Sequence, residues 1–286
     1  MIKSVIRKSL KIRYSGRRSD YITPSFGYGC LYKCAYCYMR RHVNKGLTIA
    51  TNTDDIINSI YEHVNTLGVK KPNQTHNKYW TYDLSCNEDF ALHAKYHDWT
   101  KIFNFFKNND NVFGTFATKN VNNNLLNFNP LRKIRIRFSL MPQELSNILE
   151  PNTSLIIDRI KAINTFYEAG YDVHINFSPV IILPHTKKLY EELFNLVNDI
   201  VLDEIKPYVL SEVILLTHNK KMHEYNLIHN PEAEELLWQP DKQESKVSSY
   251  GSENLRYKWQ NKNKYVDSFK KLHNSIIPWN QIRYIF

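Results

Sequence analysis

Three cysteines in the first part of the chain are the residues of this sequence best suited to chemistry. Cys30, Cys34 and Cys37 have the spacing C-x3-C-x2-C. Three thiolates this close in sequence can wrap one small inorganic centre, and a 4Fe-4S cluster normally takes four soft ligands. Three cysteines would therefore leave one iron open. The alternatives are zinc, a disulfide or inert cysteines, but a structural zinc site usually needs a second Cys/His pair, and none has suitable spacing.

The spacing, with the aromatic Tyr36 just before the third cysteine, resembles the radical S-adenosylmethionine (SAM) enzymes. The resemblance implies that the open iron binds the amino and carboxylate groups of SAM. It also implies that an electron from the cluster cleaves SAM to a 5′-deoxyadenosyl radical. An external electron donor such as flavodoxin or ferredoxin would then be a partner.

The residues around the cysteines are similar to the spore photoproduct lyase family of radical SAM DNA-repair enzymes. In CAYCYM, Tyr36 and Tyr38 flank Cys37, and tyrosines at those places in the family support hydrogen-atom relay and SAM binding. Ser85 and Cys86 form the family's Ser-Cys pair, which implies a cofactor contact for Ser85 and hydrogen-atom donation by Cys86. A lone cysteine is ordinarily a small buried hydrophobe, but a thiol has the weak S–H bond that such a donor needs.

Two further residues, each near the end of a predicted strand, resemble residues of the same family. Lys119 is similar to the lysine that meets the SAM carboxylate, for which an ammonium group is sufficient chemistry. Ser139 resembles a serine that lies against the cofactor. Both residues could instead be ordinary solvated strand ends. After the Ser-Cys pair the sequence reads Asn-Glu-Asp where the family has Thr-Ser-Asp. The histidines His93, His97 and His174 are expected to have structural roles.

Strand and helix patterns alternate six times along the chain, which predicts an α/β fold with a parallel sheet and right-handed crossovers. Six units favour a partial (β/α)6 barrel, which is also the fold that the radical SAM resemblance implies. In such sheets the chemistry lies at the C-terminal ends of the strands. The predicted strands are 21–26, 79–84, 112–117, 134–140, 173–182 and 209–216. The predicted helices begin near 51, 99 and 121, then span 153–168, where Thr153 is the expected cap, and 185–201.

Three regions make up the predicted domain organisation: a basic N-terminal arm at 1–18, the radical SAM partial barrel at 19–218, and a C-terminal extension at 219–286 that packs on the barrel. Within the extension we expect a short helix at 231–238, a polar linker at 239–252 and a final strand at 281–286. No apolar run approaches the roughly 18 residues that span a bilayer. The N-terminus lacks a continuous apolar segment, so a secretory signal is not expected. The few cysteines favour a reducing cytoplasm over a disulfide scaffold. We also expect a monomer without a membrane partner.

Positive charge is the strongest compositional signal, because the net charge is +10 over 286 residues. Such a surface suits a polyanion, whose neutralised phosphates release counterions. The alternative is a merely solvated basic face. Cations and aromatic residues also alternate near the C-terminus, where they could contact a DNA backbone and wedge beside an extruded base. The alternative for this stretch is a hydrophobic edge of the extension with solvated lysines. This stretch contains Tyr250, Arg256, Tyr257, Lys258, Trp259 and Tyr265. Tyr257 is the candidate for a second relay tyrosine.

We therefore predict a radical SAM lyase that binds UV-damaged DNA and returns the thymine dimer spore photoproduct, 5-thyminyl-5,6-dihydrothymine, to two thymines. Hydrogen abstraction from C6 would start the repair, and the thiol of Cys86 would quench the thymine radical. One alternative is an enzyme of the same branch that acts on another nucleic-acid base. The other is a non-catalytic iron–sulfur or zinc protein that binds nucleic acid, which would not need Cys86, Lys119 and Ser139 at successive strand ends.

Overall fold

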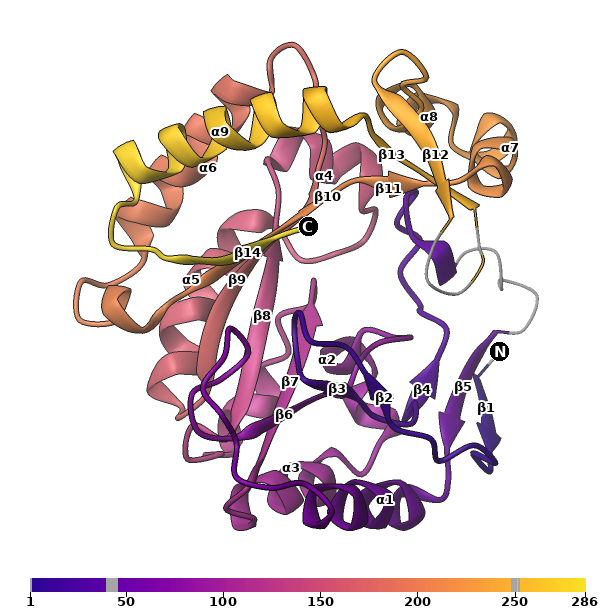
Figure 1. The fold of residues 1–286 in the computed structure, drawn as a ribbon, viewed down its shortest axis with the longest axis vertical. Helices are drawn as coiled ribbons and strands as arrows, with labels where there is room; N and C mark the ends of the chain where they lie inside the picture. The colour runs from indigo at the N-terminus through magenta and orange to yellow at the C-terminus, as the bar shows by residue number, and fades with distance from the viewer. Residues whose placement is uncertain (1, 40–45, 248–250, 252) are drawn as a thin grey trace.

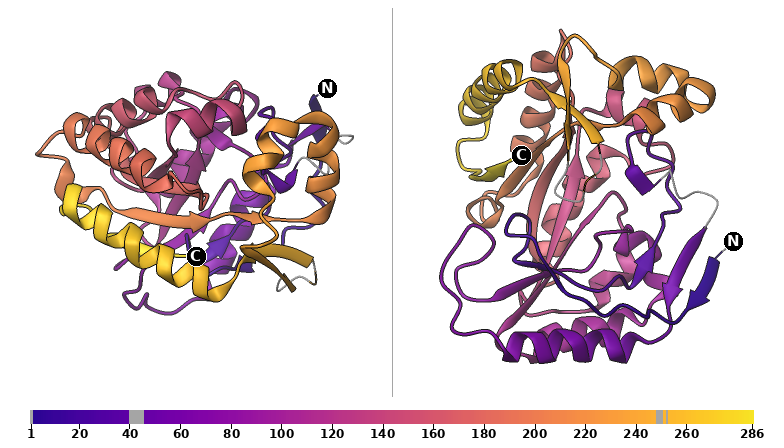
Figure 2. Two further views of the ribbon diagram at one scale, coloured as in Figure 1. Left: turned by 90° about the horizontal axis from the view of Figure 1, so that it is seen from above. Right: turned by 45° about the vertical axis from the view of Figure 1, so that its right-hand side comes forward.

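A curved sheet of eight strands organises the computed structural model, which describes residues 2–39, 46–247, 251 and 253–286. The strand order is β14-β10-β9-β8-β7-β6-β3-β2; neighbouring strands from β3 to β14 are parallel, and β2 is antiparallel to β3. The strands are β2 Arg13–Tyr14, β3 Tyr21–Ile22, β6 Trp80–Asp83, β7 Val112–Thr118, β8 Ile134–Leu140, β9 Asp172–Val180, β10 Ser211–Leu215 and β14 Ile282–Ile285. The sheet curls into an open half-barrel (Figures 1 and 2), which confirms the predicted α/β partial barrel.

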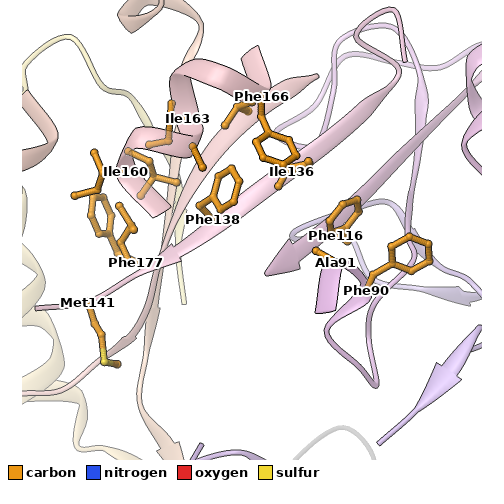
Figure 3. Close-up of a cluster of buried hydrophobic side chains, with 14 of the residues drawn as sticks. Phe90, Ala91, Phe116, Ile136, Phe138, Met141, Ile160, Ile163, Phe166 and Phe177 are labelled. Atoms are coloured by element: carbon orange, nitrogen blue, oxygen red, sulfur yellow. The ribbon is translucent and has the colours of Figure 1, made fainter. Parts of the chain in front are cut away.

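Strand β8 shows why the sheet is buried on both faces. Its apolar residues alternate with Arg135, Arg137 and Ser139, and all seven of its residues are buried. Successive side chains of a strand point to opposite faces, so the apolar set packs outward while the polar set lies inside the barrel. Figure 3 shows residues of the outward set, with Phe138 of β8 beside Phe166 of helix α5 (Ile156–Glu168). The polar interior is thus specified by sequence alternation.

Helices cover the outer face of the sheet between successive strands (Figure 1). In α6, Leu189, Leu193 and Val197 recur every four residues and are buried against the sheet. The N-cap of helix α5 (Ile156–Glu168) is Leu155, two residues later than the predicted cap Thr153. The helices between β5 and β10 are α1 Thr53–Asn65, α2 Phe90–His93, α3 Trp99–Asn108, α4 Gln143–Leu149, α5 Ile156–Glu168 and α6 Thr186–Ile200; the 3-10 helices are η2 Ala94–Tyr96, η3 Asn123–Asn127 and η4 Lys206–Tyr208.

The basic N-terminal arm is part of the folded sheets. Strand β1 (Ile2–Val5) pairs in parallel with β5 (Leu47–Ala50), which pairs with β4 (Gly27–Tyr28) in a small sheet. Strand β2 continues the main sheet beyond β3. The strand predicted at 21–26 is therefore too long: only β3 lies within it, and β4 follows it in a different sheet. The arm is a structural element that ends beside the barrel interior.

The C-terminal region contributes more to the fold than the predicted extension. Strands β11 (Thr217–His218), β13 (Glu253–Tyr257) and β12 (Gln243–Val247) form an antiparallel sheet, so the linker prediction at 239–252 is wrong where β12 lies. Helix α9 (Trp259–Ile276) packs on α6, and β14 joins the main sheet beside β10. Helices α7 Lys220–His229 and α8 Pro231–Leu237 precede the hairpin. Tyr250 lies outside the described residues.

A buried ion pair lies at the N-terminal ends of the sheet. Lys70 Nζ lies 2.6 Å from Asp20 Oδ1, and both side chains are at most 3% exposed. Asp20 also accepts hydrogen bonds from Thr75 and from the backbone and hydroxyl of Thr81. The loop before β6 is therefore fixed to the sheet at this end, opposite the strand ends that carry the predicted site.

Among the described helices, none combines the length and apolar character of a membrane span.

Candidate active site

The C-terminal ends of the parallel strands surround a cavity of about 510 Å³. This volume lies in the range of pockets that bind small molecules and cofactors, roughly 300–1,000 Å³. Side chains reach the cavity from consecutive strands because their inward-facing positions share one edge of the sheet. The residues that the strands place there are Asp83, Ala117, Thr118, Arg137, Ser139, Asn176, Ser178, Glu212, Ile214 and Tyr284.

The loop after β4 brings Cys30, Cys34 and Cys37 to this cavity. Gly29 turns the chain into the loop at φ +107°, where a Cβ atom would lie 2.7 Å from the Gly46 carbonyl oxygen. Hydrogen bonds from three other segments fix the loop, because they supply partners for the backbone of Leu31 and Ala35. These bonds run from Leu31 N to His93 Nε2 (3.3 Å), from Ala35 N to Leu149 O (2.8 Å) and from Asn226 Nδ2 to Ala35 O (3.0 Å).

The cysteines have the chemistry of soft metal ligands. Burial raises the pKa of Cys30 to about 12 and that of Cys34 well above its usual value, so the thiols keep their protons until a metal displaces them. No three His, Cys, Asp or Glu side chains in the described part of the chain converge as ligands of one metal ion do. In an iron–sulfur cluster each cysteine binds a different iron atom, so its ligands need not converge on one point. The three thiols at one cavity therefore fit such a cluster.

Lys119 lies at the end of β7 beside the cysteine loop. Its Nζ is 3.8 Å from Glu150 Oε1 and 5.6 Å from the centre of the Tyr36 ring. Desolvation favours the neutral amine, but the negative groups around it, Glu150 first and then Cys34 and Asp89, together outweigh desolvation and raise the pKa of Lys119. Asp89 holds this strand end in place, because it accepts hydrogen bonds from Lys119 N and from Thr118 Oγ1. The ammonium group is therefore charged and held at the cavity.

Three polar side chains extend this half of the cavity. Ser85 and Ser139 both line it, as the sequence predicted for cofactor contacts. Asn176 of β9, which sequence reasoning missed, donates its Nδ2 to Ser139 Oγ at 3.2 Å. The Oδ1 atom of Asn176 is buried without a hydrogen-bond partner among the described residues. A buried acceptor at a cavity that lacks a protein partner is suited to a ligand donor.

Cys86 and Tyr38 meet on the other side of the cavity. The Tyr38 hydroxyl donates a 2.5 Å hydrogen bond to the carbonyl oxygen of Cys86 and lies 3.3 Å from Asn87 Oδ1. Desolvation, followed by the influence of Cys86, raises the pKa of Tyr38, so the phenol keeps its hydrogen. The Cys86 sulfur is 3.1 Å from Arg18 Nη2 and 3.6 Å from Arg13 Nη2. The phenol therefore contacts the backbone of the residue that carries the thiol.

The other two predicted relay tyrosines have different surroundings. Tyr36 lines the cavity, and its hydroxyl donates to Glu150 Oε1. Tyr257 does not line the cavity: it is 3% exposed, and its hydroxyl accepts a hydrogen bond from Ile182 N at 2.9 Å. The structure therefore does not bring Tyr257 to the other site residues. Tyr284, which sequence reasoning missed, does line the cavity and is hydrogen-bonded to Glu212.

The Asn-Glu-Asp segment after Cys86 belongs to a buried histidine cluster. Glu88 Oε2 accepts hydrogen bonds from His93 Nδ1 at 3.0 Å and His97 Nε2 at 2.9 Å, and all three side chains are at most 2% exposed. His174 lies elsewhere, 3.3 Å from Asp172 Oδ1, where burial lowers its pKa to about 3. These contacts agree with the structural role expected for the histidines.

Comparison with known proteins finds one family repeatedly. The model of the family described as spore photoproduct lyase matches residues 2–286. The chain is 26% identical over 198 residues to spore photoproduct lyase of Clostridium acetobutylicum, an alignment covering 68% of this chain and 56% of the relative. It is 25% identical over 213 residues to that of Bacillus subtilis, covering 73% and 60%. The chain thus spans less than two thirds of the length of these curated relatives.

Solved structures share the whole fold of this chain. A cysteine-to-alanine mutant of spore photoproduct lyase has a TM-score of 0.89 at 21% identity, covering 100% of this chain and 82% of that one. Spore photoproduct lyase complexed with dinucleoside spore photoproduct has a TM-score of 0.87 at 21% identity, with the same coverage. Another mutant, with bound AdoMet and the dinucleoside, has a TM-score of 0.88 at 20% identity and the same coverage. The partial barrel is therefore the fold of these proteins.

Proposed function

Because the chain belongs to the spore photoproduct lyase family, we propose that it is a radical SAM lyase that returns spore photoproduct in DNA to two thymines. The observation that carries this proposal is that one cavity gathers the three loop cysteines, the charged Lys119 and the adjacent Cys86 and Tyr38. A protein that only binds nucleic acid has no need for this set. The relatives complexed with dinucleoside spore photoproduct support the choice of substrate.

The cavity residues fit a 4Fe-4S cluster and SAM. Cys30, Cys34 and Cys37 would hold the cluster, and Lys119 would pair with the SAM carboxylate. Ser85, Ser139 and the unpartnered Asn176 amide oxygen would supply hydrogen bonds to SAM. When bound and reduced, this pair of groups supplies the radical that abstracts hydrogen from C6 of the lesion.

The side chains on the other side of the cavity would complete the repair. Once the bond between the two bases has broken, the S–H bond of Cys86 would break as a C–H bond forms on the thymine radical, leaving the unpaired electron on sulfur. Tyr38 would then give its O–H hydrogen to that sulfur, because its hydroxyl already contacts the Cys86 backbone. Tyr36, held by Glu150 beside Lys119, would connect the relay to the cofactor.

We also propose a monomeric enzyme of the cytoplasm that receives its electron from a flavodoxin or ferredoxin. The net charge of +10 supports a DNA partner. The lesion must leave the base stack to reach the cavity. Enzymes that modify bases act on bases extruded in this way.

The decisive experiment is anaerobic. Reduced, cluster-loaded protein is incubated with SAM and an oligonucleotide that contains spore photoproduct, and chromatography measures restored thymine. We expect thymine from the wild type, and its loss or diversion to other products in Cys86→Ala. SAM cleavage without thymine release would overturn the substrate and direct the search to another nucleic-acid base, and no SAM-dependent change in the EPR signal of the reduced protein would overturn the radical SAM assignment.

A further inference from the structure

Two arginines of the N-terminal segment converge on the Cys86 sulfur. Arg18 Nη2 lies 3.1 Å and Arg13 Nη2 lies 3.6 Å from Cys86 Sγ. The three residues come together only in the fold, since 68 and 73 positions separate the arginines from the cysteine. Guanidinium groups donate hydrogen bonds and accept none, so the sulfur is the acceptor in both contacts.

The two arginines are anchored to the barrel in different ways. Arg18 Nε lies 2.5 Å from Asp83 Oδ2, which is also 3.0 Å from Arg137 Nη2. The side chains of Asp83 and Arg137 are each 2% exposed. Arg13 lies on β2, where it pairs with Ile22 of β3. The buried carboxylate therefore holds the Arg18 guanidinium, while the strand fixes the position from which the Arg13 side chain reaches the sulfur.

Two donors on one thiol restrict its geometry. A thiol sulfur has two lone pairs besides its bonds to Cβ and hydrogen, so the arginines occupy both acceptor directions and leave one for the S–H bond. Without them the Cys86 side chain can turn among staggered rotamers. The Tyr38 hydrogen bond does not prevent this, because it ends on the Cys86 carbonyl oxygen and not on the sulfur. The position of the sulfur thus depends on the arginines.

We propose that Arg13 and Arg18 are positioning residues that hold the Cys86 thiol toward the substrate radical, an inference that rests on the proposed function. A thiol in a fixed position transfers its hydrogen atom to the substrate radical without delay. If the thiol rotates away, the substrate radical persists and takes hydrogen from another source or forms an adduct. The arginines therefore control which product forms, and they leave SAM cleavage and the first hydrogen abstraction to the other side of the cavity.

The test compares three variants that each remove one positive charge from the same segment: Arg18→Gln, Arg13→Gln and the control Lys11→Gln, whose side chain is exposed. Iron content and SAM cleavage are measured first, so that each variant is known to be loaded. The readout is the ratio of thymine to all other products from the lesion. We expect this ratio to fall about tenfold in Arg18→Gln, the loss of one hydrogen bond to a charged group, and less in Arg13→Gln, with Lys11→Gln unchanged.

A double-mutant cycle separates positioning from a general structural role. In the Cys86→Ala background, Arg18→Gln and Arg13→Gln should have no further effect on the product ratio, because the group they act through is gone. Arg13→Gln keeps the proposal testable if loss of the Asp83 ion pair unfolds Arg18→Gln. An unchanged ratio in loaded arginine variants, alongside normal thymine release by the wild type, overturns this proposal alone. Absence of thymine from the wild type overturns the proposed function and this inference with it.

Discussion

Arg137 lies beneath the cavity between two buried carboxylates. Its Nη2 is 3.0 Å from Asp83 Oδ2 and its Nη1 is 2.7 Å from Glu212 Oε1, with all three side chains at most 2% exposed. Desolvation favours the protonated form of Glu212, but Arg137 and then Arg283 outweigh it and lower the pKa of that carboxyl. Removing the shared cation would leave two buried charges poorly compensated.

We therefore expect Arg137→Met to lower the free energy of unfolding by about 3–5 kcal/mol, the usual cost of breaking a buried ion pair. The lower end is expected because Arg18 and Arg283 still contact the two carboxylates. The control is Lys206→Met, which breaks a pair with the exposed Asp203 and should cost about 1 kcal/mol or less. Denaturant titration of both variants provides the comparison, and equal losses would show that the buried network is not a source of stability.

Single residues also show where sequence reasoning reaches its limit. The cysteine loop, Ser85, Lys119 and Ser139 could be predicted to share a site, because each follows a strand of one parallel sheet and such strand ends meet. The arginines at Cys86 could not, since nothing in a basic segment distinguishes a side chain that turns into the barrel from one in solvent. Tyr257 was predicted from its basic and aromatic neighbours, but its hydroxyl is taken by a backbone group.

Helix α7 contacts the cysteine loop through Asn226. Asn226 Nδ2 donates to Ala35 O at 3.0 Å and to Glu234 Oε2 at 2.7 Å. Glu234 in turn accepts hydrogen bonds from His218 and His223 through its other oxygen. The polar network of the C-terminal helices thus supports the loop that carries the proposed cluster ligands.

Asn226→Ala should therefore weaken the proposed cluster without unfolding the barrel. It leaves the buried Ala35 carbonyl without this partner, so we expect iron to be lost to a chelator about tenfold faster. The control is Asn198→Ala, which removes an amide oxygen that accepts a hydrogen bond from Trp279 Nε1. Both residues of this pair are far from the cysteine loop in sequence. Absorbance of the cluster after chelator addition gives the rates. Equal rates for the two variants would contradict a supporting role of α7.

Elements with a clear apolar pattern were predicted well, and elements in which polar residues hide or replace that pattern were not. The bounds of β8 follow from strict alternation and agree with the structure at both ends. Strand β12 has an exposed, polar sequence, so no pattern separates it from a linker. Helix α9 was missed although Tyr265, Phe269, Leu272 and Ile276 recur at helical spacing, because the many lysines and asparagines between them obscure the apolar face.

At the scale of the whole molecule, positive charge gathers beside the cavity mouth. Lys246, Arg256 and Lys262 line a second, smaller pocket that shares Phe286 with the main cavity. Desolvation, followed by repulsion from Arg256, Lys246 and Arg17, lowers the pKa of Lys262, so these cations already act on one another. A polyanion bound there would relieve this repulsion. We infer that DNA next to the lesion crosses this side of the molecule.

The salt dependence of DNA binding tests this placement. On duplex DNA each lost phosphate contact should make the plot of log K against log salt concentration shallower by about 0.9, so Lys246→Gln combined with Lys262→Gln should reduce the slope by about 1.8. The control pair is Lys270→Gln with Lys271→Gln, which removes the same charge from exposed positions of α9, the helix that covers α6. Because both pairs change the net charge equally, a long-range effect of charge would reduce both slopes alike and contradict a defined path. A smaller slope in the first pair alone would place the phosphates beside the cavity, where a base that leaves the stack has the shortest route to Cys86.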